Sequence, residues 1–523
     1  MKYKKFKLTE NEYNHIKSEL KREPNDFELH LFSATYSEHC SYKHSKELLK
    51  LLPRENAVFP FENAGGIKVG DHVILFKMES HNHPCAVEPF NGSATGIGGI
   101  IRDVLAMNAR PIALCNSLKF GDKSKRVIDG VVKGISVYGN SIGVPNISTE
   151  VLFDDCYEQN PLVNVTTIGI TKADRVLTSN MAYAGLKLML VGSATMKDGM
   201  GGAAFASKKL SDEKKSDKLS IQIANPFAKK KLIEACLDIF SKKLVIACQD
   251  CGAAGILSST SEVAYKSGCG VEINLDKIHL GDKSIKDFEI MLSETQERML
   301  FVVDEQNISE IENILDKYEL EHSIFGKVIK EKKYIVKNKG KIKADLPTVL
   351  LVNPPKVKIK FDNKKMKTQH KRTYSPTHLF TYSPIYEQYD HTVGARTQFQ
   401  PYENPQFNAL WIYEENCSLG VLTFSVVIKN NPFEEVYEAI LTASKSLEEK
   451  SYKPIGITDC LNFANPEIPP TMHEFRQTIL AIKKACEELN IPVCSGNVSF
   501  YNESNGSKIK NTPAFTMLGI KRL

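Results

Sequence analysis

Two stretches of this sequence repeat each other: Arg110-Pro-Ile-Ala-Leu-Cys-Asn-Ser-Leu-Lys-Phe-Gly121 and Lys453-Pro-Ile-Gly-Ile-Thr-Asp-Cys-Leu-Asn-Phe-Ala464. The similarity continues downstream at helical spacing, where one set of apolar residues matches another: Ile128, Val132, Ile135 and Ile142 match Phe475, Ile479, Ile482 and Leu489. Each copy then closes with an apolar strand, Val165–Ile170 or Phe515–Ile520. This internal repeat predicts a duplicated unit in which a strand, an amphipathic helix and further strands recur.

The residues between the two copies predict a second kind of domain. Helix and strand patterns alternate there, and the strand Leu186–Gly192 leads into a glycine-rich loop at Asp198–Ala203. We therefore expect a mixed α/β (α+β), internally duplicated chain. Its expected parts are an N-terminal helical region (1–30), a first α+β domain (31–175), an α/β domain (180–348), a basic linker (349–380) and the second copy (381–523).

No comparable α/β domain follows the second copy before Leu523. Three domains of an expected four are therefore present. By analogy with the first copy, an uncovered domain-sized face is expected to need a second polypeptide or an oligomer to cover it.

Composition favours an ordinary globular protein. Hydrophobic residues make up 42% of the 523 residues. The N-terminus lacks the apolar core of a signal peptide, which predicts a cytoplasmic location without a membrane span. The net charge of +6 is concentrated between Lys327 and Arg372, where 16 basic residues face 3 acidic ones. This pattern favours a solvated, β-rich connector over an RNA-binding patch.

Among the 12 cysteines, Cys248 and Cys251 form a C-x-x-C pair, interpreted as packed thiols rather than a zinc or redox site.

Groups that handle phosphate crowd into three stretches: Ser37–Lys43, Lys77–Pro84 and Gly96–Asp103. Nucleotide chemistry needs carboxylates for Mg²⁺, a cation for the phosphates and a group that transfers protons. Glu79 and Asp103 supply the carboxylates, and Lys77 supplies the cation. These stretches predict an ATP-dependent enzyme.

The glycines at 96–99 are read as a loop entering a helix, which would place Arg102 and Asp103 in the first helical turn beside an anion. An alternative role for Asp103 is to stabilise that helix N-terminus. Asp250, at the end of a strand and before glycines, is a candidate Mg²⁺ ligand. Ser293–Met299 offers an amide and carboxylates to a polar substrate, or is only a polar loop between a helix and a strand. Ser495–Ser499 is read as a turn after a strand, with a glycine that permits close approach to a ligand.

The histidines leave two other interpretations open. With nearby cysteines they could form a zinc site, for which the candidates are His39, His81, His83, Cys40 and Cys85. Any one of the histidines could instead be a structural residue. Lys77 and Arg102 in the same stretches favour phosphate over a closed zinc site.

Taken together, these motifs resemble the synthetase subunit of phosphoribosylformylglycinamidine synthase, in its small, ammonia-using form. The resemblance runs from about Phe27 to Ile520. It is carried by Ser37–Lys43, Glu79–Pro84, Gly96–Pro111, Ser293–Met299, Tyr389–Gly394, Asp459–Pro466 and Ser495–Asn502. It implies an AIR-synthetase-like (PurM-like) architecture, in which the two repeated domains pair into a central barrel.

The resemblance also implies roles for particular residues. The catalytic positions are His39 and His81. The ATP-contacting positions are Tyr42, Lys77, Asp459 and Gly496. The Mg²⁺ ligands are Glu79, Asp103, Asp250 and Asn497. The substrate-contacting positions are Ser80, His81, Asn82, His83, Arg102, Gln222, Glu294, Thr295, Gln296 and Ser499.

The implied reaction is the ATP- and Mg²⁺-dependent amidation of formylglycinamide ribonucleotide (FGAR) by ammonia, which gives formylglycinamidine ribonucleotide (FGAM), ADP and phosphate. The implied partners are a glutaminase that supplies ammonia, a small bridging subunit, and a separate chain that carries the fourth domain. Neither nucleic acid nor a membrane is expected as a partner. The alternatives are a truncated or split-subunit form without activity of its own, and another enzyme of the superfamily such as an aminoimidazole ribonucleotide or selenophosphate synthetase.

Overall fold

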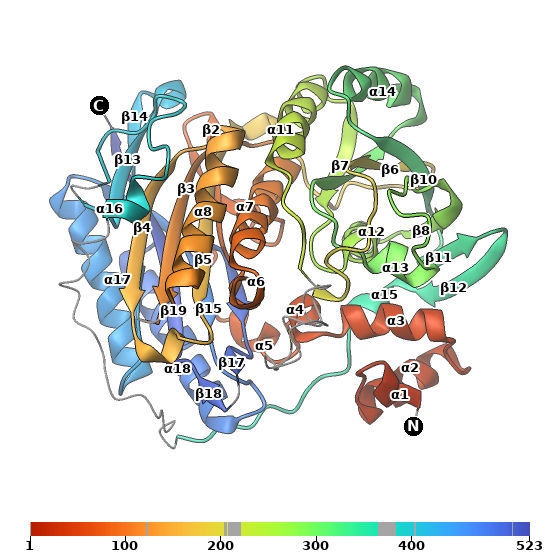
Figure 1. Cartoon of the computed structure of the whole chain (residues 1–523), viewed down its shortest axis with the longest axis horizontal. Helices are drawn as coiled ribbons and strands as arrows, with labels where there is room; N and C mark the ends of the chain where they lie inside the picture. The colour runs from red at the N-terminus through yellow and green to blue at the C-terminus, as the bar shows by residue number, and fades with distance from the viewer. Residues whose placement is uncertain are drawn as a thin grey trace.

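Three β-sheets organise the chain in this computed structural model (Figure 1). The structure describes residues 2–121, 124–202, 207, 221–363, 383–401, 404–504 and 506–522. Two of the sheets have five strands and belong to the two repeats, and the third has seven strands and belongs to the intervening domain.

The first repeat is a five-stranded sheet covered by two long helices. Its strand order is β1-β2-β5-β3-β4, with β3 and β4 parallel and the other neighbours antiparallel. The strands are β1 (Gly65–Val69), β2 (His72–Ser80), β3 (Arg110–Phe120), β4 (Asn146–Phe153) and β5 (Leu162–Lys172). The helices are α6 (Asn82–Val87), α7 (Pro89–Ala106) and α8 (Lys125–Ile142). Val132 and Ile135 of α8 are buried, as their spacing predicts.

The second repeat has the same topology, β13-β14-β19-β15-β16. Its strands are β13 (Phe407–Ile412), β14 (Cys417–Ser425), β15 (Lys453–Asn462), β16 (Val493–Ser499) and β19 (Thr512–Arg522). Its long helices are α17 (Pro432–Glu449) and α18 (Pro469–Leu489), and the short elements are α16 (Ser383–Tyr386), β17 (Glu503–Ser504) and β18 (Ser507–Lys508). The identical strand order confirms the duplication that the sequence predicts.

The two five-stranded sheets pack against each other and share one apolar core. Ile74 and Phe76 of β2 lie in the same buried cluster as Leu419 and Val421 of β14. Each fully buried side chain of this kind contributes about 1.5–3 kcal/mol to stability. Hydrogen bonds cross the seam as well, because the Ser495 hydroxyl donates to the Phe76 carbonyl at 2.6 Å. The pairing of the repeats therefore brings β2 next to β15 and β16.

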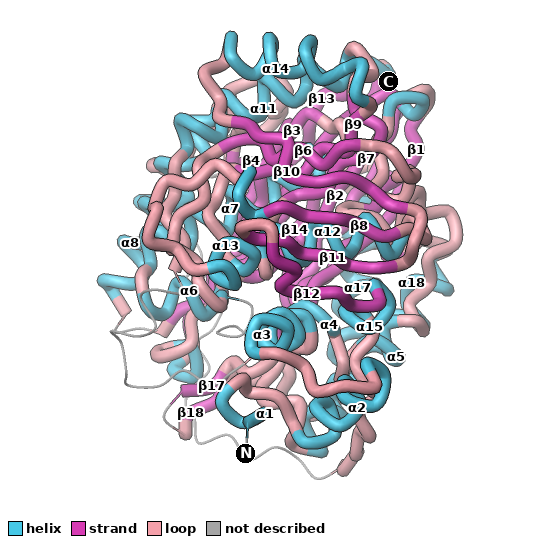
Figure 2. The backbone as a smooth tube through the Cα atoms, turned by 90° about the vertical axis from the view of Figure 1, so that its right-hand side faces the viewer, coloured by secondary structure: helices cyan, strands magenta, loops and turns pink. Residues whose placement is uncertain are grey.

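Helices α7 and α8 lie between the five-stranded sheet of the first repeat and the intervening domain (Figures 1 and 2). Its sheet order is β12-β11-β8-β10-β6-β9-β7. The strands are β6 (Lys187–Gly192), β7 (Val245–Asp250), β8 (Gly270–Asn274), β9 (Arg298–Val303), β10 (His322–Ile329), β11 (Lys333–Asn338) and β12 (Lys341–Pro347). The helices are α11 (Pro226–Ser241), α12 (Gly255–Lys266), α13 (Asp287–Leu292), α14 (Ile308–Lys317) and α15 (Thr348–Val352).

The N-terminal helices lie below this sheet in Figure 2; those up to Ser41 contribute to its apolar core, whereas Leu48 and Leu49 of the last one pack against the second repeat. They are α1 (Lys2–Lys5), α2 (Glu10–Leu20), α3 (Asp26–Thr35), α4 (Glu38–Ser41) and α5 (Lys46–Leu49). Reciprocal capping boxes fix the starts of α2 and α3, where Thr9 pairs with Glu12 and Asn25 pairs with Glu28.

Two local predictions are wrong. Residues 96–99 are not a loop, because α7 begins at Pro89, capped by Glu88, and these glycines lie inside the helix. They allow close packing instead: a Cβ on Gly98 would lie 2.6 Å from the Tyr138 hydroxyl. Ser495–Ser499 is not a turn but part of β16, which pairs in parallel with β15.

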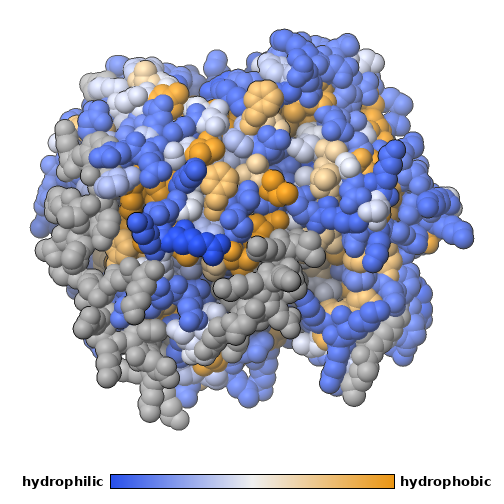
Figure 3. Space-filling view, in the orientation of Figure 1, coloured by the Kyte–Doolittle hydropathy of each residue, from blue (hydrophilic) through white to orange (hydrophobic). Residues whose placement is uncertain are grey.

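The basic segment is partly β-structure, as expected, because β10, β11 and β12 fall within or beside it. Residues 364–372 of that segment and most of the predicted linker lie outside the described residues. No helix among the described residues has both the length and the apolar character that a membrane span requires. The face seen in Figure 3 is mostly hydrophilic, with hydrophobic residues gathered near its middle.

Candidate functional site

The predicted site forms where the end of β2 meets α7 and the end of β7. Lys77 and Glu79 alternate along β2 with buried Met78, so both side chains point to the same face. The Lys77 ammonium lies 2.9 Å from the Asp103 carboxylate. Asp103 lies in the last turn of α7 and not in its first, so stabilisation of the helix N-terminus is excluded as its role.

The carboxylates here carry an excess of negative charge in a buried setting. Burial raises the pKa of Asp103 well above its usual value, and the neighbouring Asp250 and Glu79 raise it further, against the opposing effect of Lys77. Burial alone would lower the pKa of Lys77, but Asp103 and Glu79 outweigh this effect and the pKa is raised. Added positive charge would therefore be stabilised at this point.

A chain of polar side chains extends from Arg102 into the intervening domain. The Arg102 guanidinium donates to the Gln296 side-chain carbonyl and, at 3.4 Å, to Asp250. The Gln296 amide donates to Gln222, whose own amide donates to Glu294 at 2.9 Å. The sequence predicted these four substrate-contacting residues, and the structure brings them together at the boundary between two domains.

The two predicted catalytic histidines lie beside the same charges. Burial lowers the pKa of His39, and the nearby Lys77 lowers it further, while Glu79 and Glu38 oppose this. Burial also lowers the pKa of His81, whose Nδ1 is hydrogen-bonded to the Gly92 carbonyl. A carbonyl can only accept, so this bond assigns the proton to Nδ1 and leaves Nε2 as an acceptor. Both imidazoles are therefore neutral near pH 7.

A second set of predicted residues comes from the other repeat. Asp459 of β15 and Gly496 of β16 are partners in the strand register. A Cβ on Gly496 would lie 2.5 Å from the Asp459 carboxylate, so glycine makes room for it. Burial raises the pKa of Asp459 to about 7, and its Oδ2 has no hydrogen-bond partner among the described residues. A buried acceptor without a partner is expected to receive a donor from a ligand.

Asn497 links this set to the first repeat. The Ser80 hydroxyl donates to Asn497 Oδ1 at 2.9 Å, and the Asn497 amide donates to the Tyr42 hydroxyl at 3.4 Å. The pairing of the repeats therefore places Tyr42, Ser80 and Asn497 together, although more than 400 residues separate the last two in the sequence.

Other predicted residues have internal partners that account for their polar atoms. Asn82 donates to Asn462, Ser499 and Asn502, and it accepts from the Val163 amide. His83 Nε2 lies 3.2 Å from the Tyr501 carbonyl. The Thr295 hydroxyl donates to Asp198 at 2.7 Å. These residues hold the ends of β2 and β16 and the loop before β9 in place, and their contact with substrate stays a prediction.

The residues present fit Mg²⁺ in chemistry but do not form a closed cage. No group of three or more His, Cys, Asp and Glu in the described part of the chain is arranged to hold a metal ion, and this also leaves the zinc interpretation without support. Glu79, Asp103 and Asp250 nevertheless offer hard oxygen donors in a buried, negatively charged setting. Mg²⁺ in such enzymes is usually held by one or two carboxylates together with the phosphates of the nucleotide.

Three residues that were not among the predicted site residues lie next to the hydrogen-bonded side chains that start at Arg102, although one of them, Glu297, belongs to the polar stretch Ser293–Met299 that the sequence singled out. They are Tyr138, Lys229 and Glu297, all fully buried. Glu297 follows Gln296 directly, but no local motif connects a tyrosine of α8 or a lysine of α11 with it. Their burial together depends on the tertiary structure. The C-x-x-C thiols of Cys248 and Cys251 are buried and free, as predicted.

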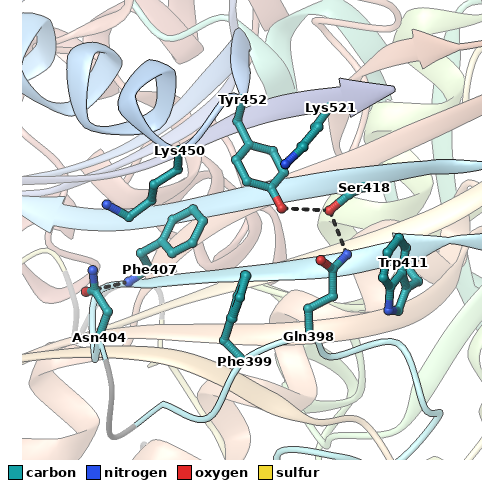
Figure 4. Close-up of a pocket in the computed structure, with 9 residues that line it drawn as sticks. All are labelled: Gln398, Phe399, Asn404, Phe407, Trp411, Ser418, Lys450, Tyr452 and Lys521. Carbon is teal, nitrogen blue, oxygen red and sulfur yellow. Dashed lines mark hydrogen bonds between the residues drawn. The ribbon is translucent and has the colours of Figure 1, made fainter. Parts of the chain in front are cut away.

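A separate cavity of about 330 Å³ lies in the second repeat and contains none of the predicted residues (Figure 4). Phe399, Trp411 and Tyr452 form part of its wall, with Lys450 beside them. When the two repeats are aligned, Lys450 corresponds to Met107 and Tyr452 to Ala109. Met107 and Ala109 belong to a buried apolar cluster of the first repeat. There Ala173 and Val176, which follow β5, pack against that cluster.

Comparison with known protein families matches most of the chain, with residues 340–430 the longest stretch outside the matched ranges. Residues 61–171 and 431–521 match the N-terminal domain of AIR synthase related proteins, and residues 184–339 match their C-terminal domain. The N-terminal model thus matches both repeats. Residues 1–43 match the linker domain of formylglycinamide ribonucleotide amidotransferase.

The chain is also similar to whole proteins. It is 43% identical to the phosphoribosylformylglycinamidine synthase subunit PurL of Petrotoga mobilis, over 98% of this chain and 73% of that protein. It is 40% identical to the same subunit of Aquifex aeolicus, over 98% of this chain and 74% of that protein. Among solved structures, Thermotoga maritima PurL complexed with FGAR has a TM-score of 0.87 at 37% identity, over 97% of this chain and 82% of that one.

Proposed function

This chain belongs to the family of phosphoribosylformylglycinamidine synthase PurL subunits, and we propose that the polar cluster around Lys77, Asp103 and Arg102 is its active site. The chain is an ATP-dependent ligase that converts FGAR into FGAM in purine biosynthesis. The placement of the site rests on one observation. A series of hydrogen bonds runs from Arg102 to Glu294 beside the buried Lys77–Asp103 pair.

The site divides into a nucleotide side and a substrate side. Tyr42, Lys77, Asp459 and Gly496 form the nucleotide side, where Oδ2 of Asp459, which has no hydrogen-bond partner within the described parts of the chain, accepts a hydrogen bond from ATP. Arg102, Gln222 and Gln296 form the substrate side, where amides and a guanidinium suit the phosphate and amide groups of FGAR. Lys77, between the two sides, is placed for the phosphoryl group that moves from one to the other.

The phosphoryl group passes from ATP to the amide oxygen of FGAR, and ammonia then displaces it as phosphate. Glu79, Asp103, Asp250 and Asn497 would hold Mg²⁺, which when bound neutralises charge on the transferred group. His39 donates a hydrogen bond to the reacting oxygen. His81, with its proton held on Nδ1 by the Gly92 carbonyl, accepts a proton at Nε2 from the attacking nitrogen.

The test measures ADP release by the purified protein with any partners that purify with it. ADP should form only when FGAR and ammonium salt at alkaline pH are both present, and FGAM should appear in equal amount. Equal ATPase activity without FGAR would show that the assignment is wrong.

The partners are inferred from the reaction, which consumes ammonia. We expect a glutaminase subunit and a small bridging subunit. The similarity of this chain to the structure of PurLQS from Thermotoga maritima supports an assembly, with a TM-score of 0.85 at 36% identity over 98% of this chain and 82% of that one. A fourth domain supplied by a separate chain stays a prediction, although this chain spans only about three quarters of its PurL relatives.

A further inference from the structure

A buried cluster of charges lies beside the substrate side of the site. Glu297 is its centre: the Lys229 ammonium lies 2.6 Å from Oε2, and the Tyr138 hydroxyl donates to Oε1 at 2.5 Å. The Lys229 side chain is 0% exposed and that of Glu297 is 1% exposed. Lys229 Nζ and Glu297 Oε2 have no hydrogen bond of good geometry among the described residues, so their attraction is mainly that of opposite charges.

This cluster joins two domains. Tyr138 belongs to α8 of the first repeat, whereas Lys229 belongs to α11 and Glu297 to the loop before β9, both in the intervening domain. The apolar side chains of α8 and α11 lie in one buried cluster around them. A carboxylate, an ammonium and a phenol therefore meet among buried apolar side chains, where the carboxylate and the ammonium neutralise each other and the phenol donates a hydrogen bond.

The cluster adjoins the hydrogen-bonded side chains on the substrate side of the site. Glu297 follows Gln296, whose side-chain carbonyl accepts from Arg102. The Tyr138 hydroxyl and the same Gln296 oxygen approach one point on α7, because a Cβ on Gly98 would lie 2.6 Å from the first and 3.1 Å from the second. Glu297 and Asp250 both act on Arg102, and together they raise its pKa against the opposing effect of burial.

The backbone at Glu297 also requires an anchor. Its φ of +63° lies in the left-handed region, where a non-glycine residue is strained. The Glu297 carbonyl accepts from the Ser193 amide at 3.1 Å, and its side chain is held from two other helices. Three contacts thus fix this turn, and the direction of the Gln296 side chain depends on it.

We propose that Glu297, held by Lys229 and Tyr138, is a positioning residue that orients Gln296 and Arg102 to bind the ribonucleotide substrate. It touches neither ATP nor the reacting atoms and acts through its neighbours. The proposal rests on the proposed active site, and it makes FGAR affinity the quantity that depends on this cluster. A purely structural ion pair would affect folding and the fraction of active protein, but not the KM for FGAR.

The experiment compares five single substitutions. Glu297→Gln keeps shape but removes the charge, Tyr138→Phe removes one hydrogen bond, and Lys229→Met removes the cation. Lys229→Arg restores a cation and is the conservative counterpart. The matched control is Lys230→Met, one residue further along α11, which removes only the surface pair with Glu234.

For each variant the KM for FGAR, the KM for ATP and kcat are measured, and FGAR affinity is checked without turnover by calorimetry. We expect Glu297→Gln and Lys229→Met to raise the KM for FGAR by about 10- to 100-fold, with kcat and the KM for ATP changed by less than about threefold. Tyr138→Phe should raise it by about three- to tenfold, whereas Lys229→Arg and Lys230→Met should remain within about threefold of the parent.

The outcomes separate this proposal from the proposed function. If the parent protein shows no FGAR-dependent ADP release, the function is wrong. If the parent is active and the KM for FGAR stays unchanged in Glu297→Gln and Tyr138→Phe while kcat falls, the cluster is structural and the positioning role is wrong. Should Glu297→Gln or Lys229→Met fail to fold, Tyr138→Phe, which keeps the ring and leaves the ion pair intact, decides the question through FGAR affinity.

Discussion

Replacing Asp459 with asparagine should make the protein more stable at alkaline pH and weaken its use of ATP. Burial raises the pKa of this carboxyl from 3.8 to about 7, and Arg54 only partly opposes the shift. The Asp459 side chain is buried and one carboxylate oxygen lacks a partner among the described residues. A group that destabilises the unliganded fold is expected to be retained for a ligand.

The direction and size of the effect follow from the two pKa values. Because the pKa in the folded state is above that of the unfolded chain, stability from this carboxyl is fully present below about pH 4. It is lost as pH rises through about 7. A shift of about three units, at 1.36 kcal/mol each, costs on the order of 4 kcal/mol well above pH 7. Asparagine cannot ionise, so the substitution removes this cost, but its buried amide also needs hydrogen-bond partners. We therefore expect Asp459→Asn to recover about half of the lost stability.

The assay is thermal unfolding of the parent and Asp459→Asn between pH 5 and pH 8.5. The variant should melt several degrees above the parent at pH 8.5 and close to it at pH 5. The matched control is Asp345→Asn, at a surface carboxylate paired with Lys333, which should not raise the melting temperature at pH 8.5. The KM for ATP should rise in Asp459→Asn alone. A variant that is equally or less stable than the parent at pH 8.5 would refute the reasoning.

Three further predictions concern the same site. Asp103→Asn should weaken Mg·ATP use, because an amide replaces a hard anionic ligand of the same shape; a titration of activity against Mg²⁺ checks this, and an unchanged curve would contradict it. His39→Ala should lower kcat by about 10²–10⁴-fold with little change in ATP affinity, measured by calorimetry; loss of ATP binding in a folded variant would make it a nucleotide ligand instead. Gly98→Ala should raise the KM for FGAR, because its Cβ would displace Tyr138 and Gln296, whereas Gly99→Ala, where a Cβ meets nothing within 4 Å, should not.

The fold was predictable because its strongest signal is internal. A helix or strand predicted in one copy supports the equivalent element in the other copy. The spacing of Ile128, Val132 and Ile135 predicted α8 correctly. The glycines of α7 were misread because glycine usually ends a helix. In this helix they permit close approach of Tyr138 and His81, which is a tertiary requirement that no local pattern reveals.

The candidate site was predictable where residues cluster in the sequence and missed where they meet only in space. Lys77, Glu79 and Asp103 lie within 27 residues of one another and were found directly. Lys229 and Tyr138 were missed because each looks like an ordinary helix residue. A buried lysine is detected only when the structure shows what neutralises it, which here is Glu297.

The two repeats carry different residues at the positions that correspond to the proposed site, which is consistent with a single site in the chain. The strand registers place Asn116 and Glu150 of the first repeat at the counterparts of Asp459 and Asn497. Glu150 is paired there with buried Lys119 at 2.6 Å, so its charge is already neutralised. The counterparts of Lys77 and Glu79 on β14 are Leu422 and Phe424, which belong to an apolar core. The counterpart position, formed by β3 and β4 of the first repeat with β14 of the second, is thus closed by an ion pair and by apolar side chains. At the position formed by β2 of the first repeat with β15 and β16 of the second, Asp459 Oδ2 has no hydrogen-bond partner among the described residues, and Lys77 and Glu79 take the place of the apolar side chains. We therefore expect the charged nucleotide to bind there.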